Sequence, residues 1–371
     1  MSLKCGIVGL PNVGKSTLFN SLSGVKAEAA NYPFCTIDPN KSIIEVPDKR
    51  LDQITEFVKP KKTIPTFVEF VDIAGLVKGA SKGEGLGNQF LGNIKDCSAI
   101  VHVVRCFEDP NVVHVEGSVD SLRDVEVIET ELLLADLAAA EKKFTSHKKA
   151  ARSGDKTQGF LRDAFEKVVA HLGEGSPVRT LALADDEKEA LNDMFFLTAK
   201  PIMYLANIDE ASAGLSHEEL CQQNEHVKKL TEFAKKNDAK ILALSAKIES
   251  ELAELSSEEK IDFLNELGID QSGLDRLIMT GYSLLNLQTY FTAGEQEVRA
   301  WTIKKNWKAP QAAGVIHTDF ERGFICADVY HYNDLLEHKS PEKIKENGLL
   351  RMEGKEYIVQ DGDILLFKFN V

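Results

Sequence analysis

Short apolar runs recur along the chain, and each ends in a glycine-rich or polar segment. They cover residues 5–9, 66–71, 99–104, 201–206 and 240–245. Runs of about four to eight apolar residues between turn signals are typical of strands buried on both faces. A helix is expected after the first run, because Leu18, Phe19 and Leu22 fall on one helical face. The pattern predicts an α/β domain with a doubly wound sheet.

Between residues 120 and 151 the short runs give way to a long helical repeat without glycine or proline. Its apolar positions are Val125, Ile128, Leu132, Ala135, Ala139 and Phe144. About thirty residues at 1.5 Å each predict a helix roughly 45 Å long. Ser153-Gly154-Asp155 interrupts the repeat, and a second one follows at 160–172. We therefore expect an antiparallel coiled-coil hairpin, with a shorter helix near 185–196 at its base.

The end of the chain predicts a small α+β unit. A helix over 272–286 closes the first domain, and strands at 288–292 and 298–303 flank a turn at Gly294. A second helix is expected over 324–334. Asp361-Gly362 before the alternating run to residue 369 is a hairpin signal. The unit is expected to resemble a β-grasp fold.

Composition limits the class of protein. The 371 residues are enough for two or three domains, and 43% hydrophobic with 27% charged residues is typical of a soluble globular chain. Six scattered cysteines predict reduced thiols in the cytosol, without a disulfide framework or a zinc site. The sequence contains neither the apolar core of a signal peptide nor a long apolar span, so we expect no association with a membrane. The net charge of −14 argues against indiscriminate nucleic-acid binding.

The most informative motif follows the first apolar run. Residues 9–17, GLPNVGKST, match the phosphate-binding pattern G-x-x-x-x-G-K-[ST] between a predicted strand and a helix. Gly9 and Gly14 allow successive N–H groups to point at phosphate oxygens, where the helix N-terminus adds positive charge. Lys15 is expected to reach the β- and γ-phosphates and the Ser16 hydroxyl to bind Mg²⁺. A chance match in a glycine-rich loop is the alternative.

Two further segments complete a phosphate site. Asp72 ends the apolar run at 66–71, in the place where a carboxylate holds Mg²⁺ through water, and Gly75 follows within a D-x-x-G motif. Thr36, in a proline-bearing stretch, is the candidate for sensing Mg²⁺ and the γ-phosphate. An ordinary turn residue is the alternative for Thr36. The spacing favours a nucleotide switch over a small-molecule kinase.

The group that orients the attacking water is not evident. Ras-type switches place a Gln directly after the D-x-x-G glycine, whereas this chain has Leu76, followed by a glycine-rich loop at 79–87. His114 is a candidate for the missing group, with a solvated loop histidine as the alternative. His102 lies inside an apolar run and is expected in the core. Cys35 is either a small buried hydrophobe or an oxidisable thiol beside the nucleotide.

The part of the site that binds the nucleotide base, the base end, is predicted at residues 207–210. Their sequence is NIDE, where GTP-binding proteins carry N-K-x-D. Asn207 is expected to bond the purine. Ile208 replaces the lysine and Glu210 replaces the aspartate that accepts from guanine N1–H and N2–H₂. The longer carboxylate favours ATP over GTP. Ser245 and Ala246, in the S-A-K loop after the last apolar run, are expected to touch the base.

Long motifs carry a family resemblance. Residues 6–20, GIVGLPNVGKSTLFN, and 72–90, DIAGLVKGASKGEGLGNQF, resemble the Obg-related P-loop proteins, and with residues 207–210 and the C-terminal unit they resemble the YchF family. The resemblance covers essentially the whole chain. It implies a cytoplasmic ATPase that binds the ribosome and its large subunit, with Mg²⁺ at Ser16 and Thr36 and base contact near Ile208. It also implies nucleotide contacts at Asn12, Val13, Gly14, Lys15, Ser16 and Thr17.

The resemblance also divides the chain into domains. A P-loop nucleotide-binding domain of the OBG type is expected at 1–119 and 198–285, with the coiled-coil insertion at 120–197. Residues 286–371 resemble the TGS domain, which is associated with RNA or regulatory binding. His317, Asp319 and Arg322 match its pattern and are expected to maintain its fold. A monomer is expected.

The predicted hairpin has a basic far half. Eight basic residues oppose Glu141, Asp155, Asp163 and Glu166, which leaves +4; they are Lys142, Lys143, Lys148, Lys149, Arg152, Lys156, Arg162 and Lys167. A solvated surface and a contact with RNA phosphates are both consistent with this patch.

Three functions remain open. One is a slow Mg²⁺-ATPase that acts as a nucleotide-controlled switch in translation or stress regulation. The others are a conventional GTPase switch and a nucleotide-bound scaffold for RNA or the ribosome with negligible turnover.

Overall fold

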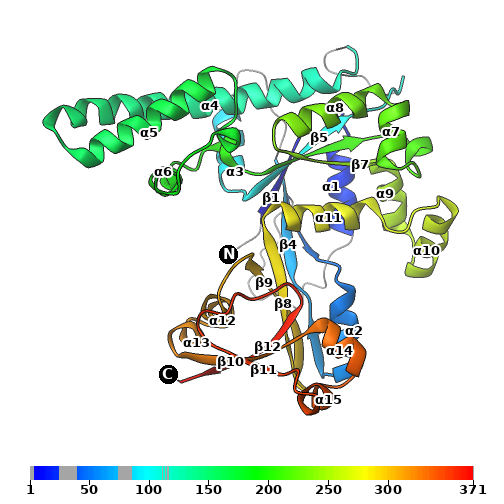
Figure 1. Cartoon of the computed structure of the whole chain (residues 1–371). Coiled ribbons are helices and arrows are strands. Elements are labelled where there is room, and N and C mark those ends of the chain that lie inside the picture. The colour runs from blue at the N-terminus through cyan, green and yellow to red at the C-terminus, as the bar shows by residue number, and fades with distance from the viewer. Residues whose placement is uncertain are drawn as a thin grey trace. The chain divides into compact units, whose positions relative to one another are not determined.

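The computed structural model describes residues 4–24, 40–73, 86–110, 112, 114 and 117–370. These residues form two compact units (Figure 1). The first contains residues 4–24, 40–42, 69–73 and those described between 86 and 277, and the second contains 43–68 and 278–370. None of the described helices is long and apolar enough to cross a membrane.

A six-stranded sheet with the order β2-β4-β1-β5-β6-β7 organises the first unit, although residues 43–45 of β2 and 67–68 of β4 are grouped with the second. Its strands are β1 Lys4–Val8, β2 Lys41–Glu45, β4 Phe67–Asp72, β5 Ala99–Arg105, β6 Ile202–Asn207 and β7 Lys240–Leu244. From β4 to β7 all pairings are parallel. Every residue of β5 and β6 is buried, as continuous apolar strands require. The predicted fold class is confirmed.

Helices surround this sheet. They are α1 Lys15–Gly24, α3 Leu86–Lys95, α7 His217–Gln223, α8 Glu225–Lys236, α9 Ala246–Glu254, α10 Ser257–Glu266 and α11 Gly273–Leu284. α1 packs against α9, and α8 packs against β6 and β7. Asn224 caps α8 and Ser245 caps α9 through their side-chain oxygens. His102 is only 1% exposed, and burial lowers its pKa to about 3, so its placement in the core is confirmed.

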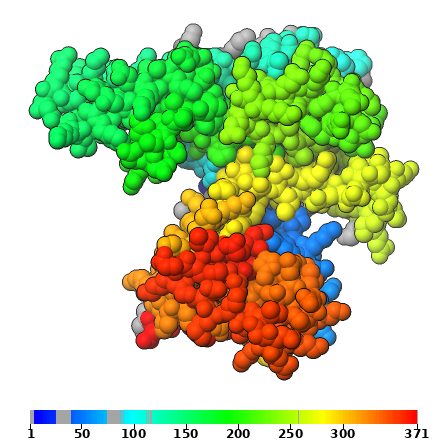
Figure 2. All heavy atoms as spheres, in the orientation of Figure 1, coloured from blue at the N-terminus to red at the C-terminus, as the bar shows by residue number. Residues whose placement is uncertain are grey.

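The predicted hairpin is present as α4 Ser121–Ala150 and α5 Lys156–Gly173, which run side by side (Figure 1). Asp120 and Asp155 cap the two helices, and Gly154 takes a φ of 81° in the turn. Figure 2 shows the hairpin extending away from the rest of the first unit. α6 Asp185–Leu191 lies within the stretch predicted for the short helix at its base.

Buried polar groups attach the hairpin to the sheet. The Asp136 carboxylate of α4 accepts from the Leu197 N–H at 2.9 Å, the Thr198 N–H at 2.8 Å and the Thr198 hydroxyl at 2.7 Å. About two turns earlier in α4, Glu129 accepts from the Tyr204 hydroxyl of β6 at 2.7 Å and from Arg179 at 3.2 Å. Since these groups lie in a dry interior, their bonds define how the hairpin base meets β6.

A second six-stranded sheet, with the order β11-β10-β12-β8-β9-β3, forms the second unit. Its strands are β3 Lys62–Ile64, β8 Leu287–Ala293, β9 Glu297–Lys304, β10 Phe324–His331, β11 Arg351–Glu353 and β12 Asp363–Phe369. Its helices are α2 Lys49–Val58, α12 Ala309–Ile316, α13 Thr318–Arg322, α14 Tyr332–His338 and α15 Pro341–Glu346. Two apolar clusters hold it together, one including α12 and the other including α2, α14 and α15.

The predicted strands around Gly294 are confirmed as β8 and β9, which pair antiparallel. The helix predicted over 324–334 is wrong, because residues 324–331 form β10 and only α14 follows as a helix. The segment FICADVYH is rich in β-branched and aromatic residues, and Ala327 and Val329 point into the core. The hairpin predicted at Asp361-Gly362 is also wrong, since the neighbours of β12 are β10 and β8.

Residues 43–68 differ from the organisation predicted by the sequence, which placed them in the nucleotide-binding domain. Leu51 and Ile54 of α2 pack with Phe291 and Val298, and β3 pairs with β9. This grouping depends on partners more than 200 residues away, and no local pattern encodes it. In α13, His317 accepts from the Asp319 N–H and Arg322 pairs with Asp319, consistent with a structural role.

Candidate functional site

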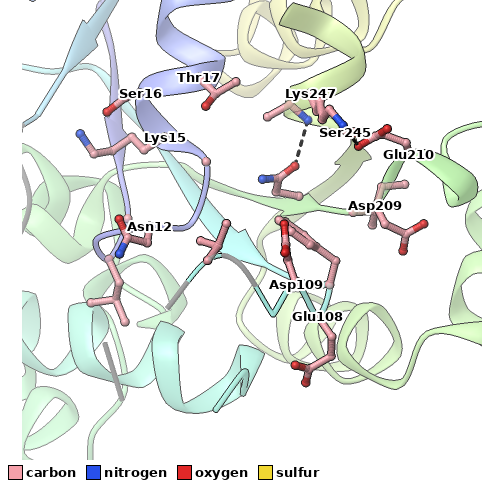
Figure 3. Close-up of a pocket in the computed structure, with 18 of the residues that line it drawn as sticks. Asn12, Lys15, Ser16, Thr17, Glu108, Asp109, Asp209, Glu210, Ser245 and Lys247 are labelled. Carbon is pink, nitrogen blue, oxygen red and sulfur yellow. Dashed lines mark hydrogen bonds and ion pairs between the residues drawn. The ribbon is translucent and has the colours of Figure 1, made fainter. Parts of the chain in front are cut away.

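A cavity of about 850 Å³ opens at the carboxyl ends of the parallel strands of the first unit (Figure 3). Four loops line it: the loop at 9–17 after β1, residues 107–110 and 112 after β5, residues 207–210 after β6 and residues 245–247 after β7. Ligands in open α/β sheets bind at this edge because the loops there diverge around a crevice. The phosphate loop and the predicted base residues therefore lie in one cavity.

The loop at 9–17 has the backbone geometry that phosphate binding requires. Asn12 and Gly14 have φ values of 62° and 94°, and α1 begins directly after them at Lys15. A Cβ at Gly14 would come within 2.2 Å of the Asn207 Nδ2 atom. Glycine at 14 is thus required both by the positive φ and by the close approach of Asn207. Lys15, Ser16 and Thr17 form the first turn of α1 and line this end of the cavity, and the first N–H groups of a helix have no partner within the helix.

Lys15 forms an ion pair with Asp72 at the end of β4. The side chains are 10% and 19% exposed, so the pair is largely shielded from water. Lys15, Ser16 and Thr17 line the cavity. Asp72 lies next to the cavity, in contact with Lys15. A hydroxyl and a carboxylate are ligands that Mg²⁺ accepts, with water completing its shell. The donor set at Ser16 and Asp72 therefore fits a magnesium ion.

Asn207 connects two walls of the cavity. Its Nδ2 atom donates to the Val13 carbonyl at 2.9 Å, and its Oδ1 atom accepts from the Ala246 N–H at 2.9 Å. The residue is only 3% exposed. The amide expected to bond a purine therefore bonds protein backbone, and it holds the phosphate loop against the loop after β7.

The remaining predicted base residues lie around Asn207. Ile208 is 2% exposed, and its N–H donates to the Leu244 carbonyl at 3.0 Å. Ser245 caps α9, which begins at Ala246. Glu210 forms an ion pair with Lys247 at 2.6 Å, and Figure 3 shows both side chains at the end of the cavity opposite Lys15 and Ser16.

Arg105, which sequence analysis did not single out, supports the wall formed by residues 107–110 and 112. Its guanidinium donates to the carbonyls of Phe107 at 3.0 Å, Val112 at 3.0 Å and Asp109 at 3.3 Å. It is 1% exposed, and its Cζ atom lies 4.7 Å from the centre of the Phe107 ring. The sequence did contain a signal for this role, since a charged residue stands at the end of the apolar run AIVHVV. An arginine buried at such a place needs acceptors for its N–H groups, and the carbonyls of the next loop can provide them.

His114 does not line the cavity. It is buried, and its Nε2 atom lies 2.8 Å from the Asp124 carboxylate near the start of α4. The role suggested for it in orienting water stays a prediction. Thr36, Gly75, Leu76 and Cys35 lie outside the described residues.

The described cysteines are all free, and within the described ranges no cluster of three or more His, Cys, Asp or Glu side chains is arranged to hold a metal ion. The magnesium site inferred at the phosphate loop involves one carboxylate and one hydroxyl, so it is independent of such a cluster.

Comparison with known proteins covers the whole chain. A family model described as "50S ribosome-binding GTPase" matches residues 4–149, and the C-terminal YchF-GTPase model, described as "Protein of unknown function (DUF933)", matches residues 287–370. The chain is 53% identical to "Ribosome-binding ATPase YchF" of Bacillus subtilis over 371 residues and 100% of both chains. The Escherichia coli O157:H7 protein of the same name is 52% identical over 371 residues, also 100% of both.

A solved structure titled "Structure of the Schizosaccharomyces pombe YchF GTPase" is also similar. It has a TM-score of 0.88 and 41% identity, with 99% of this chain and 98% of that chain covered. Both compact units therefore have counterparts in a known structure.

Arg105→Met is expected to lower the free energy of unfolding by about 2–4 kcal/mol, because the carbonyls of Phe107, Asp109 and Val112 lose their buried donor. Urea denaturation measures the loss, and hydrogen exchange should show faster opening of residues 106–110. Arg162→Met is the control, since the Arg162 side chain is 39% exposed and pairs with its neighbour Asp163. Equal stability of the two variants would contradict a supporting role for Arg105.

Proposed function

The chain belongs to the YchF family, and we propose that it is a Mg²⁺-dependent ATPase that binds the ribosome and acts as a nucleotide-controlled switch. The observation that carries the proposal is the cavity that joins the phosphate loop to residues 207–210. The full-length relatives carry the name ribosome-binding ATPase. Slow intrinsic turnover is part of the proposal, because Leu76 occupies the position of the glutamine that orients water in Ras-type switches.

The phosphate end of the cavity, formed by the loop at 9–17, binds the triphosphate. Backbone N–H groups along residues 12–17 cradle the phosphates, and the Lys15 ammonium balances the charge of the β- and γ-phosphates. The Ser16 hydroxyl would hold Mg²⁺, with Asp72 acting through water and Thr36 as a further ligand, and the bound ion would neutralise charge on the phosphate oxygens. The Gly75 N–H is assigned to the γ-phosphate. Lys15 is already next to Asp72, so the cationic and anionic groups needed for MgATP lie together.

The base end favours adenine. Guanine-binding sites of this type use an aspartate to accept from N1–H and N2–H₂, and this chain has Glu210 at that position. Asn207 is held by backbone partners and positions the wall, while Ile208 provides an apolar contact and Ser245 and Ala246 border the base. Adenine has no amino group at its 2-position, so the missing aspartate does not weaken its binding.

Hydrolysis needs a group that orients water. We assign this role to His114, which requires the segment between β5 and α4 to bring it from Asp124 to the phosphate end. The described part of that segment includes the cavity wall that Arg105 supports. Because His114 lies in the same segment, a shift of this wall when the nucleotide changes would also shift His114.

The basic half of the hairpin is the proposed contact with ribosomal RNA. Lys142, Lys143, Lys148, Lys149, Arg152 and Lys156 are all exposed. The Lys148 ammonium lies 5.1 Å from the centre of the Phe144 ring, so an aromatic surface adjoins the charges. Backbone phosphates are attracted to such a patch even when the protein as a whole is acidic. The TGS-like second unit is a further candidate for RNA contact, and the large subunit is the proposed partner.

Calorimetric titration of the full chain in Mg²⁺ with ATP, ADP, GTP and GDP tests the nucleotide assignment. Adenine nucleotides are expected to bind at least about tenfold more tightly, which corresponds to about 1.4 kcal/mol. Tight GDP binding with weak ADP binding would make the protein a GTPase. Absence of ATP turnover even with ribosomes would make it a nucleotide-bound scaffold.

His114→Ala is expected to keep ADP affinity within about twofold and to lower ATP turnover by about 100-fold or more, because a proton-handling group is lost. Single-turnover hydrolysis and calorimetry separate the two effects. The control is His171→Ala, since His171 bonds Pro177 and Thr180 at the hairpin base. Unchanged turnover of the His114 variant would remove the assignment.

Reversing two hairpin charges with Lys148→Glu and Lys149→Glu is expected to weaken ribosome co-sedimentation about tenfold at about 0.1 M salt, and to make binding less salt-dependent. The matched control reverses Lys235 and Lys236, two adjacent exposed lysines at the end of α8. A similar loss in both double variants would indicate a general charge effect and contradict a specific contact by the hairpin.

A further inference from the structure

The ion pair between Glu210 and Lys247 joins the two loops at the base end of the cavity. Glu210 follows β6, and Lys247 lies in the first turn of α9 after Ser245 and Ala246. The Lys247 Nζ atom is 2.6 Å from the Glu210 Oε1 atom, and Figure 3 shows the two side chains close together. Both residues line the cavity.

Recognition of guanine by a carboxylate needs both of its oxygens. One accepts from N1–H and the other from N2–H₂, and a bidentate contact of this kind is stronger and more directional than a single bond. The Lys247 ammonium already occupies one oxygen of Glu210. Guanine would have to share or displace this partner, whereas adenine has no pair of donors on that edge and meets no such requirement.

The other side chains of the loop at 207–210 do not replace the engaged carboxylate. Asn207 bonds Val13 and Ala246, Ile208 has no polar group, and the Asp209 carboxylate accepts from the Ser212 N–H at 3.0 Å. Lys247 faces acidic groups: hydrogen bonding to Glu210, together with the charges of Glu251 and Asp109, raises its pKa. Because lysine is already protonated at neutral pH, the ammonium persists through the physiological range.

We propose that Lys247 is a specificity-determining residue, which engages Glu210 and so denies guanine a two-oxygen contact. The inference rests on the proposed preference for adenine and names a residue that produces part of it. The side chains of Lys247 and Glu210 are 66% and 47% exposed, so the pair is a partly solvated one. Pairs of this kind contribute modestly, and the expected effect on discrimination is about two- to fivefold.

The experiment measures the ratio of the GDP and ADP dissociation constants by calorimetry on the full chain in Mg²⁺. Lys247→Met, which removes the charge and keeps the length, is expected to lower this ratio about two- to fivefold. Lys247→Arg keeps the charge and should retain the ratio. Lys229→Met is the matched control, because Lys229 pairs with Glu225 on α8 and does not line the cavity. Using the ratio cancels effects on phosphate binding that both nucleotides share.

Salt provides a second measurement on the unmodified chain. Raising the ionic strength from about 0.1 to about 1 M shortens the screening length from about 10 to about 3 Å and weakens the pair. The ratio should fall toward that of Lys247→Met, which should itself respond less. If Lys247→Met does not fold, the dependence of the ratio on salt in the unmodified chain still tests the role of Lys247.

The outcomes distinguish this inference from the proposed function. If the unmodified chain binds GDP more tightly than ADP, the proposed function fails. If it prefers ADP and the ratio is unchanged in Lys247→Met and insensitive to salt, the proposed function stands and the role of Lys247 is overturned. A parallel loss of affinity for both nucleotides would also overturn it, since Lys247 would then contact a part common to both.

Discussion

The amide of Asn207 is the interaction on which the cavity depends. It donates to the Val13 carbonyl in the phosphate loop and accepts from the Ala246 N–H at the start of α9. One buried side chain therefore sets the distance between the phosphate end and the base end. It also constrains position 14, where any Cβ would collide with it. A single amide can do this because, at 3% exposure, its bonds are shielded from water.

The opposite wall is built by the same means. Arg105 closes β5 with its guanidinium buried against three carbonyls of the following loop, and Cys106 continues the connection by donating its N–H to the Asn207 carbonyl at 2.8 Å. A backbone hydrogen bond thus connects the wall after β5 with the wall at 207–210. These hydrogen bonds position the two walls at the base end, while at the phosphate end the Lys15 ammonium is held beside Asp72.

The hairpin is connected to this structure through β6. Tyr204 bonds Glu129 of α4, and three residues later the strand ends at Asn207 in the cavity. Near the start of α4, Asp124 holds His114. A displacement of α4 therefore bears on both the base end and the candidate catalytic histidine, which gives a physical route by which a partner at the hairpin and the nucleotide can influence each other.

The sequence by itself determined the features that depend on local pattern: the parallel strands, the phosphate loop, the length of the hairpin and the placement of residues 207–210. Spacing and residue type are sufficient there, because each element satisfies its backbone within a few residues or by a repeated apolar face. The tertiary structure alone decided the others. Asn207 as a clamp, Arg105 as a support, β10 in place of a helix and the membership of residues 43–68 all depend on partners far along the chain. Burial and hydrogen bonding to those partners outweigh local propensity, and neither is visible until the chain is folded.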